Sequence, residues 1–181
     1  DRLSSVAATY GGCAGAYPLA ASEFPITRCT GHTATKRGGA DPTGQTLRTT
    51  GGSKVLLGFL PSEDATIVDK FRAAGAIFLG KTGMHEFAYG PTGINPHFGP
   101  AHNPWSLGHS VGGSSGGSGV NVAARITFAS LGTDLGGSGR IPPALCGVVG
   151  LKQTFGRVSQ RGLLATTFNG DHIVGITRCA R

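Results

Sequence analysis

The chain has 181 residues, of which 32 are glycine and only 14% are charged, and its formal net charge is +7. This length suits one domain over residues 1–181, apolar runs such as 55–60 exclude a disordered chain, and the glycines lack the three-residue period of collagen. A packed, enzyme-like core is therefore expected. The positive charge lacks a Lys/Arg cluster with interleaved aromatics, which favours a merely basic surface over nucleic-acid binding.

Residues 1–35 show no clear period and form a weakly defined N-terminal region, whereas 36–160 hold the expected active-site core. The first clear element is a helix that begins after a Ser62 cap and ends at Gly75. The short apolar segment 76–79 then predicts a buried strand. A helix that runs directly into a buried strand indicates an α/β fold. The apolar stripe of the helix consists of Ile67, Val68, Phe71 and Ala74.

Two glycine-rich loops that contain serine dominate the second half of the chain. Their glycines lack a common flanking pattern, so we treat them as two loops and not as a repeat. The expected elements, in order, are a loop over 90–105, a serine loop over 112–119, a helix over 120–124, a strand over 126–131, a second serine loop over 132–142 and a buried strand near 148–149.

No apolar stretch approaches the roughly 18 residues that cross a bilayer, and the N-terminus shows no secretory signal pattern. We therefore expect a soluble, cytoplasmic protein without a membrane partner. The cysteines stand at positions 13, 29, 146 and 179 and form no CxxC pair. Reduced, structural thiols are expected, with no metal site.

The two serine loops suggest a site that stabilises a negatively charged group during a reaction. Glycines beside a serine permit backbone conformations that other residues avoid, and they let consecutive N–H groups converge as in an oxyanion hole. A Ser-His-Asp triad is the competing interpretation, but no GxSxG elbow is present. The adjacent His85 and Glu86 do not form the HExxH metal motif, so structural roles are favoured for both. The histidines available to a triad are His32, His85, His97, His102, His109 and His172.

Taken together, these segments resemble the signature of the amidase signature family. The similarity is dense from about Thr49 to Ser159 and looser as far as Arg178. The resemblance implies a three-layer α/β/α fold with a mixed β-sheet, incomplete at the C-terminus because family members are much longer. The matching segments are Gly112–Gly119, Gly132–Pro142, Gly80–Ala88, Asn103–Trp105 and Cys146–Lys152.

The resemblance implies an amidase, a hydrolase of carbon–nitrogen bonds other than peptide bonds, that works through a serine acyl-enzyme and a Ser-Ser-Lys triad. Ser138 would be the nucleophile, and Ser114, on a cis peptide after Gly113, would relay its proton to Lys36. The resemblance implies no cofactor and no metal. Backbone N–H groups of Leu135, Gly136, Gly137 and Ser138 would form the oxyanion hole, and Ser115, Thr133, Asp134 and Arg140 would support the site.

Two lysines are candidates for the base of the triad. A lysine takes a proton only when desolvation leaves it neutral. Lys36 holds the family position upstream of Thr49–Ser53, although Thr35 and Arg37 replace the aliphatic and acidic neighbours usual there. Lys81, in the well-matched Gly-Lys-Thr segment, is the competitor, and otherwise it is a structural lysine at the end of a strand.

The expected substrate is a small-molecule amide of unspecified identity, and homo-oligomers are an open possibility. One alternative is a glutamyl-tRNA amidotransferase A-type subunit, the single case in which nucleic acid is expected as a partner. Another alternative is a non-catalytic fragment or binding module of the same fold. Because the C-terminal part of the family fold is missing, we expect the isolated chain to be prone to aggregation.

Overall fold

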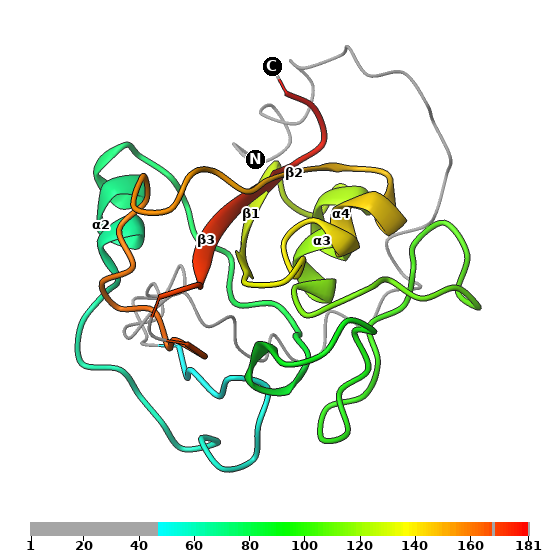
Figure 1. The fold of residues 1–181 in the computed structure, drawn as a ribbon, viewed down its shortest axis with the longest axis horizontal. Coiled ribbons are helices and arrows are strands. Elements are labelled where there is room, and N and C mark those ends of the chain that lie inside the picture. The colour runs from blue at the N-terminus through cyan, green and yellow to red at the C-terminus, as the bar shows by residue number, and fades with distance from the viewer. Residues whose placement is uncertain (1–46, 168, 181) are drawn as a thin grey trace, which may run out of the picture.

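The computed structural model describes residues 47–167 and 169–180 (Figure 1). Among these residues, no helix is long and apolar enough to span a membrane. The helices are α2 (Thr66–Ala73), the 3-10 helix η2 (Glu86–Ala88), α3 (Gly116–Ala123) and α4 (Ile141–Cys146), and the strands are β1 (Ala129–Asp134), β2 (Val149–Leu151) and β3 (His172–Thr177).

The three strands form one sheet in the order β1-β3-β2, with β3 in the centre. Along β1 the register runs from Ala129 opposite Thr177 to Asp134 opposite His172. β2 pairs with the opposite edge of β3, and both pairings are antiparallel. The parallel pairs of the expected mixed sheet are therefore not found within the part of the chain that the structure describes.

Helices lie on both faces of this sheet, as in the expected α/β class. Figure 1 shows α2 on one side of β3 and the pair α3–α4 on the other. Ile173 packs with Leu163 on the α2 side, where Ile67 of the helix joins the cluster. Neighbouring side chains of a strand point to opposite faces. Val174 and Ile176 accordingly face α3 and the serine loops, and both are buried.

The first helix begins later than the sequence predicts. Ser62 does not cap it, because the N-cap position is occupied by Ala65, which makes no side-chain capping bond. The N–H group of Thr66 donates instead to the Arg161 carbonyl at 3.2 Å. A distant carbonyl thus satisfies a donor at this helix start, and a local pattern could not reveal it.

The predicted burial around this helix is largely wrong. Within the stripe, Val68 is buried but Phe71 is 40% exposed. Segment 76–79 pairs with no strand in the described residues, and Ile77 and Leu79 are 75% and 57% exposed. A strand requires a partner edge for its backbone groups, and the described chain places none beside this segment.

The elements that the sequence predicts after residue 112 are present in type and differ in extent. α3 begins inside the glycine run, where a Cβ on Gly117 would lie 2.6 Å from the Gly83 carbonyl oxygen. The strand expected over 126–131 is shifted toward the C-terminus and reaches Asp134. β2 is present, but its outward residues Val149 and Leu151 are exposed, contrary to the prediction of a buried strand.

Helix α4 was not expected, and the Asn103–Trp105 segment explains how it ends. The Asn103 amide donates to the Leu145 carbonyl at 2.9 Å, and the Trp105 indole donates to the Cys146 carbonyl at 2.6 Å. Gly147 then takes a left-handed conformation at the C-cap, with φ of 66°. Cys146 is a free, buried thiol whose pKa is raised by burial to about 11, as expected for an inert structural cysteine.

Candidate active site

The two serine loops, which lie far apart in the sequence, touch each other in the fold. The N–H group of Ser115, at the start of α3, donates to the Ser138 carbonyl at 3.2 Å. Ser114 therefore lies next to the loop that follows β1 and contains Ser138. The structure thus brings together the two serines singled out from the sequence.

The first loop is shaped by close backbone packing. The peptide bond between Gly113 and Ser114 is cis, as the resemblance implies, and Gly112 adopts a φ of 72°. A Cβ on Gly113 would lie 2.5 Å from the Gly90 carbonyl oxygen, so only glycine fits. Ser114 is fully buried, its carbonyl accepts the His85 N–H at 3.0 Å, and its hydroxyl has no hydrogen-bond partner among the described residues.

The neighbouring serines join α3 to the outer edge of β1. The Ser115 hydroxyl accepts the Thr133 N–H at 3.1 Å and donates to the Thr133 carbonyl at 3.2 Å. The Ser118 hydroxyl donates to the Leu131 carbonyl at 2.7 Å. Gly132 permits this approach, because a Cβ there would lie 2.9 Å from the Ser115 hydroxyl oxygen. Ser115 and Thr133 therefore act together as structural support for the first loop.

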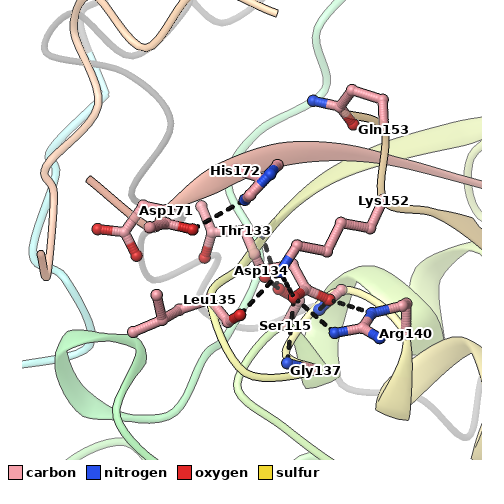
Figure 2. Close-up of polar contacts among 12 residues, drawn as sticks. Ser115, Thr133, Asp134, Leu135, Gly137, Arg140, Lys152, Gln153, Asp171 and His172 are labelled. Carbon is pink, nitrogen blue, oxygen red and sulfur yellow. Dashed lines mark hydrogen bonds and ion pairs between the residues drawn. The ribbon is translucent and has the colours of Figure 1, made fainter. Parts of the chain in front are cut away.

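A buried carboxylate organises the second loop. The Asp134 side chain is 0% exposed, and it accepts the N–H groups of Gly137 at 3.1 Å and Gly139 at 3.0 Å. The Arg140 guanidinium adds two bonds, from Nε at 2.9 Å and from Nη2 at 3.1 Å (Figure 2). Because its carboxylate is fully enclosed, the contact of Asp134 with Arg140 is not a simple surface ion pair.

A second cationic partner, which the sequence analysis did not identify, completes this arrangement. The Lys152 ammonium lies 2.9 Å from Oδ1 of Asp134 and donates to the Leu135 carbonyl at 2.7 Å (Figure 2). Lys152 belongs to a segment that matches the family, and this was the only sequence signal for it. Its role depends on β2 ending beside the second loop, which spacing along the chain does not show.

The charge state of Asp134 follows from these contacts. Burial alone would raise the pKa of this carboxyl, but hydrogen bonds from Arg140, Lys152 and the Gly139 N–H outweigh that effect and hold the pKa below its usual range. Asp134 is therefore ionised at neutral pH and acts only as a hydrogen-bond acceptor.

One of the four N–H groups expected to form the oxyanion hole already has a partner in the protein. Gly137 donates its N–H to Asp134 and is thereby occupied. Within the described chain, the N–H groups of Gly136 and Ser138 make no hydrogen bond to protein. Ser138 is half-buried, whereas Leu135 and Gly136 in the same loop are exposed.

The structure describes the surroundings of only one of the two lysines predicted as the base. Lys36 lies outside the described residues. Lys81 is 6% exposed, and its ammonium donates to the Leu47 carbonyl at 3.3 Å and to the Thr49 hydroxyl. Burial lowers the pKa of Lys81 to about 8, against the opposing attraction of Asp64. Lys81 makes no hydrogen bond to Ser114 or Ser138 in the described structure.

The segment that follows Lys81 nevertheless borders the first serine loop. The Gly117 N–H donates to the Gly83 carbonyl at 3.0 Å, and the hydroxyls of Thr82 and Ser118 lie 3.0 Å apart. The backbone of the Gly-Lys-Thr segment thus packs against the start of α3, while the lysine side chain points to residues 47–49.

The histidines and Glu86 have other partners. The carboxylate of Glu86 lies 2.8 Å from Nε2 of His97, and hydrogen bonds from Ser53 first and then from His97 lower its pKa. His109 lies 2.8 Å from the Ser106 hydroxyl, and His172 lies 2.8 Å from the Gly170 carbonyl. No described histidine ring forms a hydrogen bond with the hydroxyl of Ser114 or Ser138, which leaves the Ser-His-Asp interpretation without geometric support.

Comparison with known proteins agrees with the motif. The family model described as Amidase matches residues 44–181. The chain is 52% identical over 130 residues to the A subunit of the glutamyl-tRNA(Gln) amidotransferase of Anaeromyxobacter sp. (strain K), a match that covers 72% of this chain and 26% of that protein. It therefore spans about a quarter of the length of the curated relatives that it matches.

Solved structures give the same result. The A subunit of the glutamyl-tRNA(Gln) amidotransferase of Thermotoga maritima matches with a TM-score of 0.70 and 46% identity, over 72% of this chain and 29% of that one. A 6-aminohexanoate cyclic dimer hydrolase complexed with substrate matches with a TM-score of 0.69 and 42% identity, over 72% of this chain and 28% of that one. These likenesses support the α/β fold class.

Proposed function

The chain belongs to the Amidase family, and on this basis we propose that it carries the catalytic serines of an amide-cleaving enzyme. The observation that carries the proposal is the contact between the two serine loops, which sets the buried Ser114 hydroxyl, without a partner among the described residues, next to the loop of Ser138. A buried hydroxyl without a hydrogen-bond partner costs free energy. A role of Ser114 in relaying a proton accounts for this hydroxyl better than a role in packing does.

The proposed reaction runs through an acyl-enzyme. The Ser138 hydroxyl oxygen attacks the amide carbon while Ser114 accepts its proton and passes its own proton to a neutral lysine. The tetrahedral oxyanion is held by N–H groups from Leu135, Gly136 and Ser138, with Gly137 kept for Asp134. Its collapse breaks the carbon–nitrogen bond, and the amine leaves with the relayed proton. Water then attacks the ester, which releases the acid and restores Ser138.

For the lysine, we propose Lys36, with Lys81 as the alternative. The buried position and lowered pKa of Lys81 suit a base, but its ammonium is bonded to Leu47 and Thr49 and not to a serine. Lys36→Ala should therefore abolish the chemical step with little change in thermal midpoint, whereas Lys81→Ala should mainly lower stability. The reverse pattern transfers the role of base to Lys81.

Within this chemistry, the role of an amidotransferase A-type subunit has the stronger support. Identity of 52% to one protein of that name, and 46% to a solved structure of another, favours glutamine as the amide and an assembly that delivers the ammonia to glutamyl-tRNA. A free amidase is the second candidate, favoured by 42% identity to a cyclic dimer hydrolase. The cytoplasmic location, the three-layer architecture and a homo-oligomer remain predictions.

The products formed from two amides distinguish these candidates, because glutamine hydrolysis releases ammonia whereas ring opening of a cyclic dimer gives a linear product with a primary amine. The purified chain would be assayed with L-glutamine and with 6-aminohexanoate cyclic dimer, with and without proteins and tRNA that co-purify with it. Glutamine hydrolysis that increases with co-purified proteins supports the amidotransferase role. Turnover of the cyclic dimer alone supports a free amidase, and absence of both activities, with no covalent labelling of Ser138, indicates a non-catalytic module.

A further inference from the structure

Lys152 is distinguished from the other cations of the site by the second group that it binds. Its ammonium bridges the carboxylate of Asp134, at 2.9 Å, and the backbone carbonyl of Leu135, at 2.7 Å. The side chain is 21% exposed and comes from the residue directly after β2 (Figure 2). Arg140, in contrast, directs both of its hydrogen bonds to the Asp134 carboxylate.

The Leu135 carbonyl determines the direction of a neighbouring N–H group. The peptide between Leu135 and Gly136 is trans, because the Gly113–Ser114 bond is the only cis bond among the described residues. In a planar trans peptide the C=O and N–H groups point in opposite directions. Since Lys152 holds the carbonyl on the side of Asp134, the Gly136 N–H points to the opposite side of the loop.

The peptides of this loop are therefore held by two different groups. Asp134 fixes the N–H groups of Gly137 and Gly139, and Lys152 fixes the carbonyl that precedes Gly136. A Cβ at position 136 would meet nothing within 4 Å, and glycine has the greatest backbone freedom of all residues, so the orientation of this peptide depends on the groups that bind it. Lys152 is the described group that supplies this restraint.

We propose that Lys152 is a positioning residue that holds the Gly136 N–H toward the oxyanion that forms on attack by Ser138. The inference rests on the proposed function, because it assumes that Ser138 is acylated. Lys152 itself touches no substrate atom in this role. It acts by fixing the peptide, so that the donor is already oriented when negative charge develops, the condition under which such donors accelerate acyl transfer most.

Arg140 provides a matched control. Lys152→Met and Arg140→Met each remove one cation from Asp134, but only the first releases the Leu135 carbonyl. A role confined to neutralising Asp134 predicts similar effects of both substitutions. A role in orienting the Gly136 N–H predicts a clear difference in the rate of covalent reaction at Ser138.

The test follows the reaction of the full chain with an alkyl fluorophosphonate, whose phosphoryl oxygen occupies the position of the oxyanion. Concentration series separate the inactivation rate constant from the apparent binding constant, and the labelled fraction reports how much protein is folded. We expect Lys152→Met to lower the rate constant about 10- to 100-fold, with the binding constant and the labelled fraction little changed. Arg140→Met should lower it at least several-fold less.

Equal rate constants in the two variants, or a wild-type rate constant in Lys152→Met, would overturn the inference. If Lys152→Met does not fold, Lys152→Arg keeps a cation beside Asp134 but cannot present a single ammonium to both groups. We expect a reduced rate constant for it, and a wild-type value overturns the proposal. A wild-type chain that is not labelled at Ser138 refutes the proposed function itself, whereas labelling that is insensitive to Lys152 refutes only the positioning role.

Discussion

Residues 172–177 and 76–79 are both short segments rich in aliphatic side chains, yet only the first is buried. Strand β3 pairs with β1 on one side and β2 on the other, and its Val174 and Ile176 are 1% and 0% exposed. Ile77, in contrast, is 75% exposed, and its segment pairs with no described strand. The difference lies in what surrounds each segment and not in its own apolar content.

The polar groups around β1 also depend on what surrounds them. Around β1, backbone groups of Thr133 and Leu131 are satisfied by serine hydroxyls, and the carboxylate of Asp134 by several donors. The buried hydroxyls of Ser114 and Thr133, in contrast, have no partner in the described structure, and that of Ser114 lies beside the loop of Ser138. The backbone around β1 is thus bonded to serine side chains, whereas the Ser114 hydroxyl is left available within the described residues.

The largest expected effect concerns that available group. Ser114→Ala should lower kcat about 10²- to 10⁴-fold, because it removes the proton relay. Stability should not fall, because the deleted hydroxyl makes no hydrogen bond in the described structure. Ser115→Ala is the matched control, and it should cost about 1–3 kcal/mol in the free energy of unfolding, because it leaves Thr133 unpaired. Urea unfolding and steady-state rates of both variants check the contrast, and a large stability loss in Ser114→Ala would contradict it.

Removal of the central carboxylate charge should have the next largest effect. Asp134→Asn should lower the free energy of unfolding by about 3–5 kcal/mol, as expected when one partner of a buried ion pair is removed. Because the pKa of Asp134 is held below its usual range, its contribution is complete above the ordinary value of about 4. That contribution is lost as the pH falls toward the lower folded value. Unfolding curves between pH 2 and 7, pH values that span roughly this window, should show this acid-dependent loss in the wild type and not in the variant.

A pair of truncations tests the comparison of the two apolar segments directly. Ile176→Ala should cost about 2–5 kcal/mol, because it opens a cavity between β3 and α3. Ile77→Ala should change the free energy of unfolding by less than about 0.5 kcal/mol, because the side chain is largely exposed. Equal losses in the two variants would show that segment 76–79 is buried in solution, and the account of its exposure would then be wrong.

The last expected effect is a slope of stability against pH, and it concerns Lys81. Its folded pKa of about 8 lies below the ordinary lysine value, so the unfolded chain binds the proton more tightly. Stability should therefore rise with pH between about 8 and about 10.4, by at most about 1.4 kcal/mol per pH unit. Lys81→Met should remove this rise. Chemical unfolding at several alkaline pH values measures the slope, and an unchanged slope in the variant would assign the rise to another group.

The fold and the candidate site were predictable where neighbouring residues determine them. The glycines around Ser114 and Ser138 indicated two close backbone approaches, and the structure places the two loops in contact. Helix α2 begins at Thr66 because of the carbonyl of Arg161, which is remote in sequence. Lys152 likewise reaches Asp134 only because the end of β2 lies beside the second loop. Such features depend on tertiary contacts, to which local periodicity is blind.

Strand β3 illustrates the same limit. Gly175 interrupts its aliphatic residues, and the segment therefore lacks a clear alternating pattern, although it occupies the centre of the sheet. Its position between β1 and β2 is set by pairing on both sides. Context of this kind overrides intrinsic strand preference.

The most direct test of the proposed mechanism is to identify the residue that is acylated. The chain would be mixed with an activated ester, quenched in acid within the first turnovers, digested and analysed by mass spectrometry. We expect an acyl group on Ser138 in the wild type, none in Ser138→Ala, and slower accumulation in Ser114→Ala with the adduct still on Ser138. An acyl group on another serine, or full turnover by a folded Ser138→Ala variant, would contradict the proposed mechanism.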